Sequence, residues 1–394
     1  MERIKVGIIG TGFSARSHLE ALRRLPHVEV IAIASGSMER AEQVARQFGI
    51  RKAYADANQL IHDPEVEVVH NCTPNHLHFP INREVLSAGK HLLSEKPLAM
   101  NSEESRRLME LAQKSEAVSG VCFNYRHYPM VAEARAAIAS GKYGRVFLVY
   151  GGYLQDWLLY DTDYNWRLDP ERNGNSRAIA DIGSHWCDTV QHVLGRRIVE
   201  VFADLKTVHP VRLKPKDQVA TFGTSEEGAR EETPIRTEDY GSVLVHFEGG
   251  IHGVFTVSQV SAGRKNKLYF EIAAEKASLA WDQEEPNRLW IGRRDEPNRE
   301  LVRDPSLLSP QAASMAHYPG GHQEGWPDGL KNLFIDFYEE VRRKRNGNAA
   351  AGAGDGKERT ASFATFEDGH RIMELIDAIL ESHRTKKWVQ LPSD

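Results

Sequence analysis

The chain has 394 residues, of which 41% are hydrophobic and 27% charged, and its formal net charge is −5. This length accommodates roughly two domains that each bury their own core. No apolar run approaches the roughly 20 residues that span a bilayer, so we expect no membrane contact, and without a broad basic field we expect no nucleic-acid partner.

The N-terminus lacks the apolar core and the small-residue cleavage site of a secretory signal. The three cysteines, Cys72, Cys122 and Cys187, are sparse and show no close pairing. This pattern is typical of a reducing compartment and argues against a disulfide framework. We therefore expect a cytoplasmic protein.

Residues 1–124 alternate short apolar runs with helical patterns. This alternation predicts an α/β domain with a doubly wound parallel sheet, covered by helices on both faces. The expected strands are residues 5–9, 28–34, 66–71, 91–94 and 118–123. The expected helices are residues 14–25, 38–48, 80–88 and 102–114.

The first expected strand runs into a glycine-rich turn and then into a helix. Gly10 permits the tight turn, Gly12 lets a pyrophosphate approach the backbone, and Ala15 allows the helix to pack closely on the strand. In this setting the turn predicts a Rossmann dinucleotide site. The residues expected at the cofactor are Gly10, Thr11, Gly12, Phe13 and Ser14.

The end of the second expected strand bears on cofactor choice. An NAD enzyme usually carries a carboxylate there for the ribose 2′-hydroxyl, whereas this sequence places Ser35, Ser37 and Arg40 after Ala34. These three side chains suit a 2′-phosphate, which favours NADP over NAD. The alternative is that Arg40 is a solvated helix residue and the site accepts NAD.

Glu95, Lys96 and Pro97 follow the strand expected at residues 91–94, at the sheet edge where doubly wound proteins bind ligands. Lys96 can donate to a substrate hydroxyl and stabilise developing negative charge, with Glu95 fixing its position. The alternative is an ion pair on a surface loop.

From about residue 146 the pattern changes to alternating, turn-punctuated segments, which predicts a mostly antiparallel sheet in an α+β domain over residues 125–394. The expected strands are residues 146–153, 198–207, 240–247, 250–258 and 267–274. Two helices are expected later, at residues 328–345 and 362–383.

Asp181 and His185 are spaced i, i+4 and share one face if the segment is helical. A histidine there can accept a hydroxyl proton while a carboxylate raises its basicity. Two alternatives stay open. One is a structural histidine; the other is a metal site of His185, Cys187, Asp188 and His192, whose spacing matches no standard zinc pattern, so we expect no metal.

The chain contains five short motifs whose order and spacing can be compared with those of known families. They are Gly10-Thr11-Gly12, Thr73-Pro74-Asn75-His76, Glu95-Lys96-Pro97, Asn124-Tyr125-Arg126, and Asp181 with His185. Together they resemble the Gfo/Idh/MocA oxidoreductases, named from glucose-fructose oxidoreductase and inositol dehydrogenase, over nearly the whole chain.

The resemblance implies that Lys96 is the catalytic lysine beside the nicotinamide, His185 the proton-transfer residue and Asp181 a substrate-binding or orienting carboxylate. It also implies an open sheet in the second domain that packs against a partner subunit, hence a homodimer or homotetramer. The residues implied near the nicotinamide ribose or elsewhere at the cofactor are Thr73, Pro74, Asn75, His78 and Glu95.

Aromatic and polar side chains suited to a sugar gather in two later segments, residues 155–167 and 321–326. They resemble the loops of sugar and anhydrosugar dehydrogenases in the family, although such tryptophans also commonly fill a core. The expected pocket residues are Tyr125, Arg126, Trp166, Arg167 and His322.

These features favour reversible hydride transfer between an NAD(P) nicotinamide and a secondary hydroxyl of an unphosphorylated sugar, anhydrosugar or cyclitol. One alternative is a glycosidase that keeps its dinucleotide and oxidises transiently. Another is a non-catalytic sensor of dinucleotide or sugar, because a fold alone does not dictate function.

Overall fold

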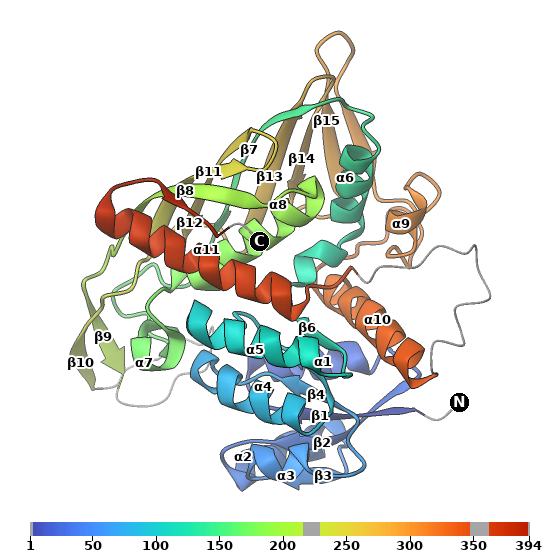
Figure 1. Ribbon diagram of the computed structural model, residues 1–394, viewed down its shortest axis with the longest axis vertical. Coiled ribbons are helices and arrows are strands. Elements are labelled where there is room, and N and C mark those ends of the chain that lie inside the picture. The colour runs from blue at the N-terminus through green and yellow to red at the C-terminus, as the bar shows by residue number, and fades with distance from the viewer. Residues whose placement is uncertain (1–2, 216–228, 347–361, 393–394) are drawn as a thin grey trace. The chain divides into compact units, whose positions relative to one another are not determined.

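The computed structural model describes residues 3–215, 229–346 and 362–392. The chain divides into two compact units (Figure 1). The first unit holds Met1–Asn124 and Pro327–Arg371, and the second holds Tyr125–Trp326 and Ile372–Asp394. Residues 125–394 were expected to form the second domain, whereas the described residues 327–346 and 362–371 group with the first unit.

The first unit is built on a six-stranded sheet in the order β3-β2-β1-β4-β5-β6, with every neighbouring pair parallel. This is the strand order of the dinucleotide-binding fold, so the predicted doubly wound sheet is confirmed. The short strand β3 was not predicted. The strands are β1 (Ile4–Ile9), β2 (Val28–Ala34), β3 (Lys52–Tyr54), β4 (Val68–Asn71), β5 (His91–Ser94) and β6 (Ser119–Val121).

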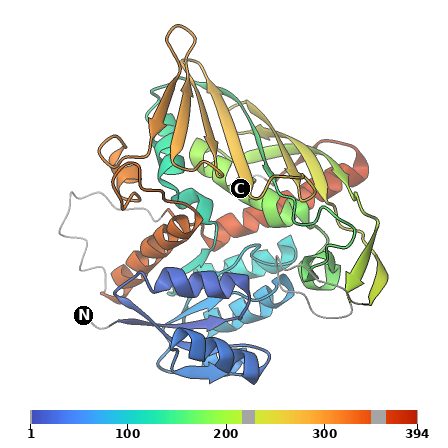
Figure 2. The ribbon, with the colours of Figure 1, turned by 180° about the vertical axis from the view of Figure 1, so that it is seen from behind.

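Helices connect these strands and lie on both faces of the sheet (Figures 1 and 2). Right-handed crossovers on either side of β1 require this arrangement, because the strand order reverses there. The helices between the strands are α1 (Phe13–Leu22), α2 (Met38–Phe48), α3 (Ala57–Ile61), η1 (Asn75–Leu77), α4 (His78–Ser87) and α5 (Ser102–Lys114).

The C-terminal part of the first unit packs on this sheet through specific contacts. Helix α10 (Trp326–Arg345) carries Tyr338, whose hydroxyl lies 2.8 Å from Nε2 of His70 in β4. Val121 of β6 forms an antiparallel bridge with Ala364. These contacts join positions more than 200 residues apart, which no local sequence pattern reveals.

The second unit contains a nine-stranded sheet in the order β16-β15-β14-β13-β7-β12-β11-β8-β17. Only β12 and β7 pair in parallel among its described strands, so the predicted mainly antiparallel α+β domain is confirmed. The strands are β7 (Val146–Leu154), β8 (Ile198–Lys206), β11 (Tyr240–Phe247), β12 (Ile251–Ser258), β13 (Lys267–Ala274), β14 (Ser278–Asp282), β15 (Arg288–Gly292), β16 (Arg299–Val302) and β17 (Val389–Gln390). Strands β9 (Val211–Pro215) and β10 (Arg230–Pro234) form a separate two-stranded antiparallel sheet.

Helices cover one face of the nine-stranded sheet. The Trp186 ring of α8 stacks on Phe255 of β12 with centroids 4.6 Å apart. Gly151 of β7 makes this possible, since a Cβ there would lie 2.7 Å from Nε1 of Trp186. The remaining helices are η2 (Asn124–His127), α6 (Pro129–Ala139), η3 (Trp166–Leu168), α7 (Pro170–Asn173), η4 (Ile179–Gly183), α8 (Ser184–Leu194), α9 (Pro310–Ala313) and α11 (Phe366–Thr385).

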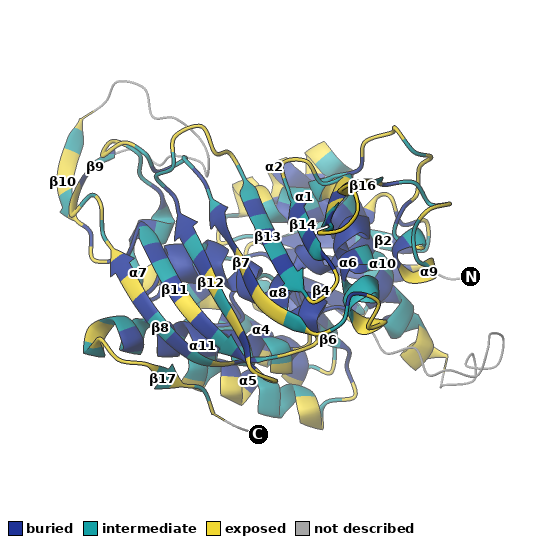
Figure 3. Cartoon of the chain, turned by 90° about the horizontal axis from the view of Figure 1, so that it is seen from above, coloured by how far each residue is buried: buried dark blue, intermediate teal, exposed yellow. Residues whose placement is uncertain are grey.

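The other face of this sheet carries exposed apolar side chains, and Figure 3 shows exposed positions along β7, β11 and β12. Tyr150, Val254 and Leu244 are exposed and lie directly opposite one another on these three neighbouring strands. Directly opposite residues share a sheet face, so the three side chains form one apolar row.

Candidate functional site

The predicted glycine turn joins β1 to α1 in the first unit. Gly10 has φ of +119°, and a Cβ at this position would lie 2.5 Å from the carbonyl oxygen of Cys72. Any other residue would therefore meet both backbone strain and a steric clash. Ala15 is fully buried, which agrees with the close helix–strand packing expected of a small residue there.

Gly12 is the N-cap of α1, and a Cβ built on it would meet no atom within 4 Å. The turn therefore leaves backbone accessible at the positive end of a helix, where an anion is favoured. Phe13 and Ser14 begin this helix, and the Phe13 side chain is 48% exposed. The Thr11 hydroxyl lies 3.5 Å from that of Ser35, which joins the turn to the end of β2.

Ser37 and Arg40 lie at the start of α2. The Ser37 hydroxyl accepts a hydrogen bond from the Arg40 backbone N–H at 3.4 Å, which makes Ser37 the N-cap of this helix. The Arg40 side chain is exposed at the same helix end. Ser37 thus has a structural task that is independent of any cofactor.

The loop after β4 is held by buried hydrogen bonds. Oδ1 of Asn71 accepts from the Thr73 hydroxyl at 2.7 Å, and its amide donates to Asn82 at 2.8 Å. The buried His78 ring lies between two backbone carbonyls, 2.6 Å from that of Pro97 and 2.8 Å from that of Thr73. Burial lowers the pKa of His78, so the neutral ring can donate to only one of these carbonyls at a time.

His78 therefore ties the loop after β4 to the loop after β5. Pro74 and Asn75 lie in the same stretch, and Asn75 is buried where η1 begins. The structure brings the predicted residues 73–78 and 95–97 together at the carboxyl ends of these two strands. This is the edge where doubly wound sheets bind their ligands.

Glu95 is held as a carboxylate next to Lys96. Oε1 of Glu95 lies 3.1 Å from Nε2 of His18, and Oε2 accepts from the Lys96 backbone N–H at 3.1 Å. Burial alone would raise the pKa of Glu95, but the hydrogen bond from His18, its charge and Lys96 together lower it to about 2. Glu95 is thus ionised at neutral pH and accepts hydrogen bonds only.

A buried chain of side chains continues from Glu95 into the unit. Nδ1 of His18 lies 2.8 Å from Nδ1 of His70, whose Nε2 lies 2.8 Å from the Tyr338 hydroxyl. Burial lowers the pKa of His70 far below its usual range, so this ring carries one hydrogen. Whichever of the two histidines supplies the hydrogen between them, Nε2 of His18 must donate to Glu95.

Cys122 also approaches His18, with Sγ 3.6 Å from its Nε2. The donor atoms of His18, Glu95 and Cys122 all lie within 4.8 Å of one another, a spacing that one metal ion could share. Burial raises the pKa of Cys122 well above its usual range. This group differs from the set of His185, Cys187, Asp188 and His192 that the sequence analysis weighed.

In the second unit, Asp181 lies in η4, a π-helical turn that leads into α8. Its carboxylate accepts from Nε2 of Gln259 at 3.0 Å and lies 3.5 Å from Nε of Arg167. The predicted helical setting of Asp181 and His185 is present, with a local π-turn that propensity does not indicate. Such π-turns occur frequently at functional sites.

His185 lies in α8 beside two buried tyrosines. Its ring meets the Tyr125 ring edge-on with centroids 4.9 Å apart, and the Tyr153 ring centroid lies 6.1 Å away. The two tyrosine hydroxyls are 2.7 Å apart, and the Asn266 amide donates to that of Tyr125 at 3.1 Å. Burial raises the pKa of Tyr125 to about 12, with hydrogen bonds opposing and the charge of Asp181 adding to the rise.

Arg126 forms a buried ion pair with Asp188 of the same unit. Its Nε lies 3.0 Å and 2.9 Å from the two carboxylate oxygens of Asp188, and both residues are buried. Asp188 belongs to the metal set weighed above, and His192 of that set lies beside Arg135, with Nδ1 2.5 Å from Nη1. The geometry gives Arg126 and Asp188 a structural partnership.

The remaining predicted pocket residues, Trp166, Arg167 and His322, come from two separate segments of the chain. The Arg167 guanidinium stacks over the Trp166 ring at 4.6 Å, and both residues are half-buried. His322 is exposed, and its backbone carbonyl accepts from the buried Arg303. Arg167 is thus the member of this set that reaches Asp181.

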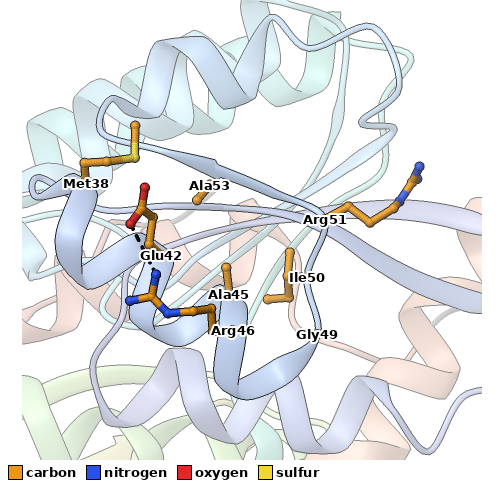
Figure 4. Close-up of a pocket in the computed structure, with 8 residues that line it drawn as sticks. All are labelled: Met38, Glu42, Ala45, Arg46, Gly49, Ile50, Arg51 and Ala53. Atoms are coloured by element: carbon orange, nitrogen blue, oxygen red, sulfur yellow. Dashed lines mark hydrogen bonds and ion pairs between the residues drawn. The ribbon is translucent and has the colours of Figure 1, made fainter.

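A surface pocket of the first unit lies along α2 and β3, and the exposed Glu42–Arg46 ion pair forms part of its lining (Figure 4). None of its lining residues belongs to the predicted cofactor site. They are Met38, Glu42, Ala45, Arg46, Gly49, Ile50, Arg51 and Ala53.

Several residues with direct contacts to the predicted site were missed in the sequence. His18 bonds Glu95, Gln259 bonds Asp181, and Tyr153 and Asn266 bond Tyr125. None of them stands in a recognisable motif. Each reaches its partner from another element of the fold, so only the tertiary structure reveals it.

Comparisons with known proteins show the family to which the chain is similar. Residues 4–123 match the model described as oxidoreductase family, NAD-binding Rossmann fold, and residues 131–280 match the GFO/IDH/MocA C-terminal domain. The levoglucosan dehydrogenase of Pseudarthrobacter phenanthrenivorans is 31% identical over 403 residues, covering 100% of this chain and 99% of that protein.

Two further relatives extend the comparison. The 1,5-anhydro-D-fructose reductase of Ensifer adhaerens is 34% identical over 201 residues, covering 50% of this chain and 58% of that protein. A solved levoglucosan dehydrogenase in complex with NADH and levoglucosan superposes with a TM-score of 0.85 at 27% identity, covering 99% of this chain and 100% of that one.

The described residues contain no helix that is both long and apolar enough to cross a membrane. The predicted family resemblance is confirmed by the matches over both parts of the chain. The chain belongs to the Gfo/Idh/MocA oxidoreductases and carries their NAD-binding Rossmann fold.

Proposed function

We propose that this oxidoreductase transfers a hydride reversibly between a nicotinamide and a carbon that bears a secondary hydroxyl in an unphosphorylated sugar, anhydrosugar or cyclitol. The observation that carries the proposal is the grouping of Asp181, Arg167, Gln259 and His185 with paired tyrosine hydroxyls in the second unit. Neutral and singly charged polar groups of this kind suit hydroxyls. The similarity to a levoglucosan dehydrogenase and to a 1,5-anhydro-D-fructose reductase supports the same substrate class.

The proposed roles follow from the chemistry of each side chain. His185 takes the hydroxyl proton during oxidation and returns it during reduction, and Asp181 orients the substrate or the imidazole. Lys96 stabilises the alkoxide-like oxygen in the transition state. The bound nicotinamide supplies the hydride acceptor or donor.

We propose the first unit as the dinucleotide-binding domain and the second as the domain for substrate binding and oligomerisation. The cofactor residues of the proposal are the turn Gly10–Ser14, then Thr73, Pro74, Asn75 and His78, and Glu95 with Lys96. The open cap at Gly12 fits a pyrophosphate, because it offers backbone N–H groups with no side chain in the way. Within this set, His78 is proposed to position the loops after β4 and β5, since its ring nitrogens lie near the backbone carbonyls of Thr73 and Pro97.

The choice between NAD and NADP is proposed to depend on Arg40, with Ser35 and Ser37 beside it. The end of β2 carries no carboxylate for a ribose 2′-hydroxyl, which supports NADP. The solved relative in complex with NADH supports NAD. We therefore propose that both dinucleotides bind and that Arg40 strengthens binding of the 2′-phosphate.

Assembly into a homodimer or homotetramer is proposed through the apolar row of Tyr150, Val254 and Leu244. Contiguous apolar surface of this kind is costly when left in water. A Leu244→Glu variant should dissociate in a measurement of native mass, whereas Val302→Lys on the edge strand β16 should not.

We also propose a cytoplasmic location, which the three free, buried cysteines support.

The test of the reaction follows the absorbance of reduced nicotinamide while the purified protein meets NAD and NADP separately. The panel holds cyclitols, aldoses, anhydrosugars and keto-sugars. A signal with one class is the expected result. No signal across the panel, with cofactor binding measured independently, would refute the proposed dehydrogenase.

A further inference from the structure

Gln259 stands out because it is fully buried and donates directly to Asp181. It follows β12, and its Nε2 lies 3.0 Å from Oδ2 of Asp181. Its backbone is fixed as well, since its N–H donates to the Asp239 carbonyl at 3.0 Å and its carbonyl accepts from Leu158 at 3.1 Å. The side chain therefore reaches Asp181 from a fixed base.

The orientation of the Gln259 amide is set by a charged residue behind it. Nη1 of Arg177 donates to Oε1 of Gln259 at 2.8 Å, and arginine has no acceptor. The oxygen of the amide must face Arg177, so the NH₂ group must face Asp181. A flipped amide would lose both hydrogen bonds in a buried site.

Arg177 is itself immobilised. It is fully buried, forms an ion pair with Asp239, and its Nε donates to the Thr237 hydroxyl at 3.2 Å. Its backbone carbonyl also accepts from the Asp181 N–H at 2.7 Å. Arg177 thus holds Asp181 twice, once through this backbone hydrogen bond and once through Gln259.

We propose that Gln259, oriented by Arg177, is a positioning residue that holds Asp181 as an oriented carboxylate for the hydride-transfer reaction. The inference rests on the proposed function, because it assigns Gln259 to the same site. Arg167 completes the arrangement from the other side, with Nε 3.5 Å from Oδ1 of Asp181. One carboxylate oxygen thus faces the amide and the other faces a guanidinium.

The deciding variant is Gln259→Glu. Its carboxylate keeps an acceptor for Arg177 but presents a second oxygen to Asp181 at hydrogen-bond distance, and two carboxylates so close share a proton. We expect the limb of the kcat/KM pH profile that depends on Asp181 to move upward by about one pH unit or more. Gln259→Met should move it in the same direction, because Asp181 loses a donor.

The matched control is Gln191→Glu in α8. Gln191 also uses its amide oxygen as an acceptor, from the Ile198 N–H at 2.8 Å, but it contacts Asp181 in no described interaction. Its profile should superpose on that of the wild type. Wild-type pH profiles in both Gln259 variants, with only thermal stability reduced, would overturn the inference and leave the proposed function standing.

A second readout does not depend on turnover. Carbon-13 NMR of labelled aspartate, with the Asp181 signal identified by its loss in Asp181→Asn, should show the carboxyl titrating at higher pH in Gln259→Glu than in the wild type. An unchanged titration would overturn the inference even if no substrate is found. Failure of the whole sugar panel, with the carboxyl shift present, would refute the proposed function instead.

Discussion

Nε2 of His18 lies 3.1 Å from Oε1 of Glu95, and Nε2 of His62 lies at the same 3.1 Å from Oε1 of Glu84. The two pairs have the same chemistry and differ in exposure. The side chains of His18 and Glu95 are 0% and 15% exposed, whereas those of His62 and Glu84 are 59% and 36% exposed. The exposed pair therefore serves as a control for the effect of burial on the same interaction.

The first prediction is that His18→Leu destabilises the protein more at neutral pH than in acid. The pKa of Glu95 falls from 4.5 to about 2 on folding, which corresponds to about 3 kcal/mol of stability. Because the pKa is depressed, this contribution is fully present above pH 4.5 and is lost as the pH falls through 2. His62→Leu should cost less than about 1 kcal/mol.

Urea unfolding of both variants at pH 7 and near pH 3 measures this difference. The gap between His18→Leu and the wild type should narrow at pH 3, because the Glu95 carboxyl is then already mostly protonated in the unfolded chain and part of its contribution is lost. An equal gap at the two pH values would show that His18 acts through packing alone.

The second prediction separates the two glycines of the turn. Gly10→Ala should lower the free energy of unfolding by about 2 kcal/mol or more, because φ is +119° and the new Cβ meets the Cys72 carbonyl. Gly12→Ala should leave stability unchanged, since its Cβ meets nothing within 4 Å, but should weaken NAD binding about tenfold or more. Calorimetric unfolding and dinucleotide titration read the two effects separately. Unchanged NAD affinity in Gly12→Ala would contradict pyrophosphate binding there.

Local periodicity predicted most of the first sheet, because parallel buried strands read as short apolar runs. β2, β5, α2 and α5 have the predicted bounds. The strand β3 was missed, as its three residues are half-buried and show no apolar run. The place of the described residues 327–346 and 362–371 in the first unit was not predicted for another reason, since it depends on contacts such as that of Tyr338 with His70.

The residues of the candidate site likewise fall into those that the sequence predicts and those that only the structure reveals. Motifs with fixed spacing, such as the turn at Gly10 and the pair of Asp181 and His185, were found from the sequence alone. Their partners His18 and Gln259 were not, because a hydrogen bond across two elements leaves no spacing signal. Arg126 was likewise found from its motif, whereas its ion-pair partner Asp188 became evident only in the structure.

The third prediction concerns this buried Arg126–Asp188 pair. Arg126→Met should lower the free energy of unfolding by about 3 to 5 kcal/mol, because it leaves Asp188 buried without its counter-charge. The double variant Arg126→Met/Asp188→Leu should recover much of that loss. Chemical denaturation of the three proteins tests the cycle. A large rise in KM with unchanged stability would instead give Arg126 a role in substrate binding.

The fourth prediction concerns the proposed catalytic groups. Lys96→Ala and His185→Ala should each lower turnover by about two to four orders of magnitude, as expected when an electrostatic or acid–base contribution is lost. Dinucleotide affinity should stay within a few-fold of the wild type in His185→Ala. Steady-state kinetics on the best substrate of the panel makes the comparison. Near wild-type turnover in both variants would end the assignment.

The last prediction addresses cofactor choice at the start of α2. Arg40→Ala should weaken NADP binding about tenfold, equivalent to about 1.4 kcal/mol, because a guanidinium near a 2′-phosphate is lost. NAD binding should change less than twofold, since NAD carries no phosphate at that position. Arg46→Ala is the matched control, an exposed arginine of the same helix that pairs with Glu42 at 3.3 Å. Fluorescence titration of the wild type and both variants with each reduced dinucleotide measures the six affinities. Equal weakening of NAD and NADP in Arg40→Ala would show that Arg40 does not contact the 2′-phosphate, and the proposed preference for NADP would then have no support at this helix end.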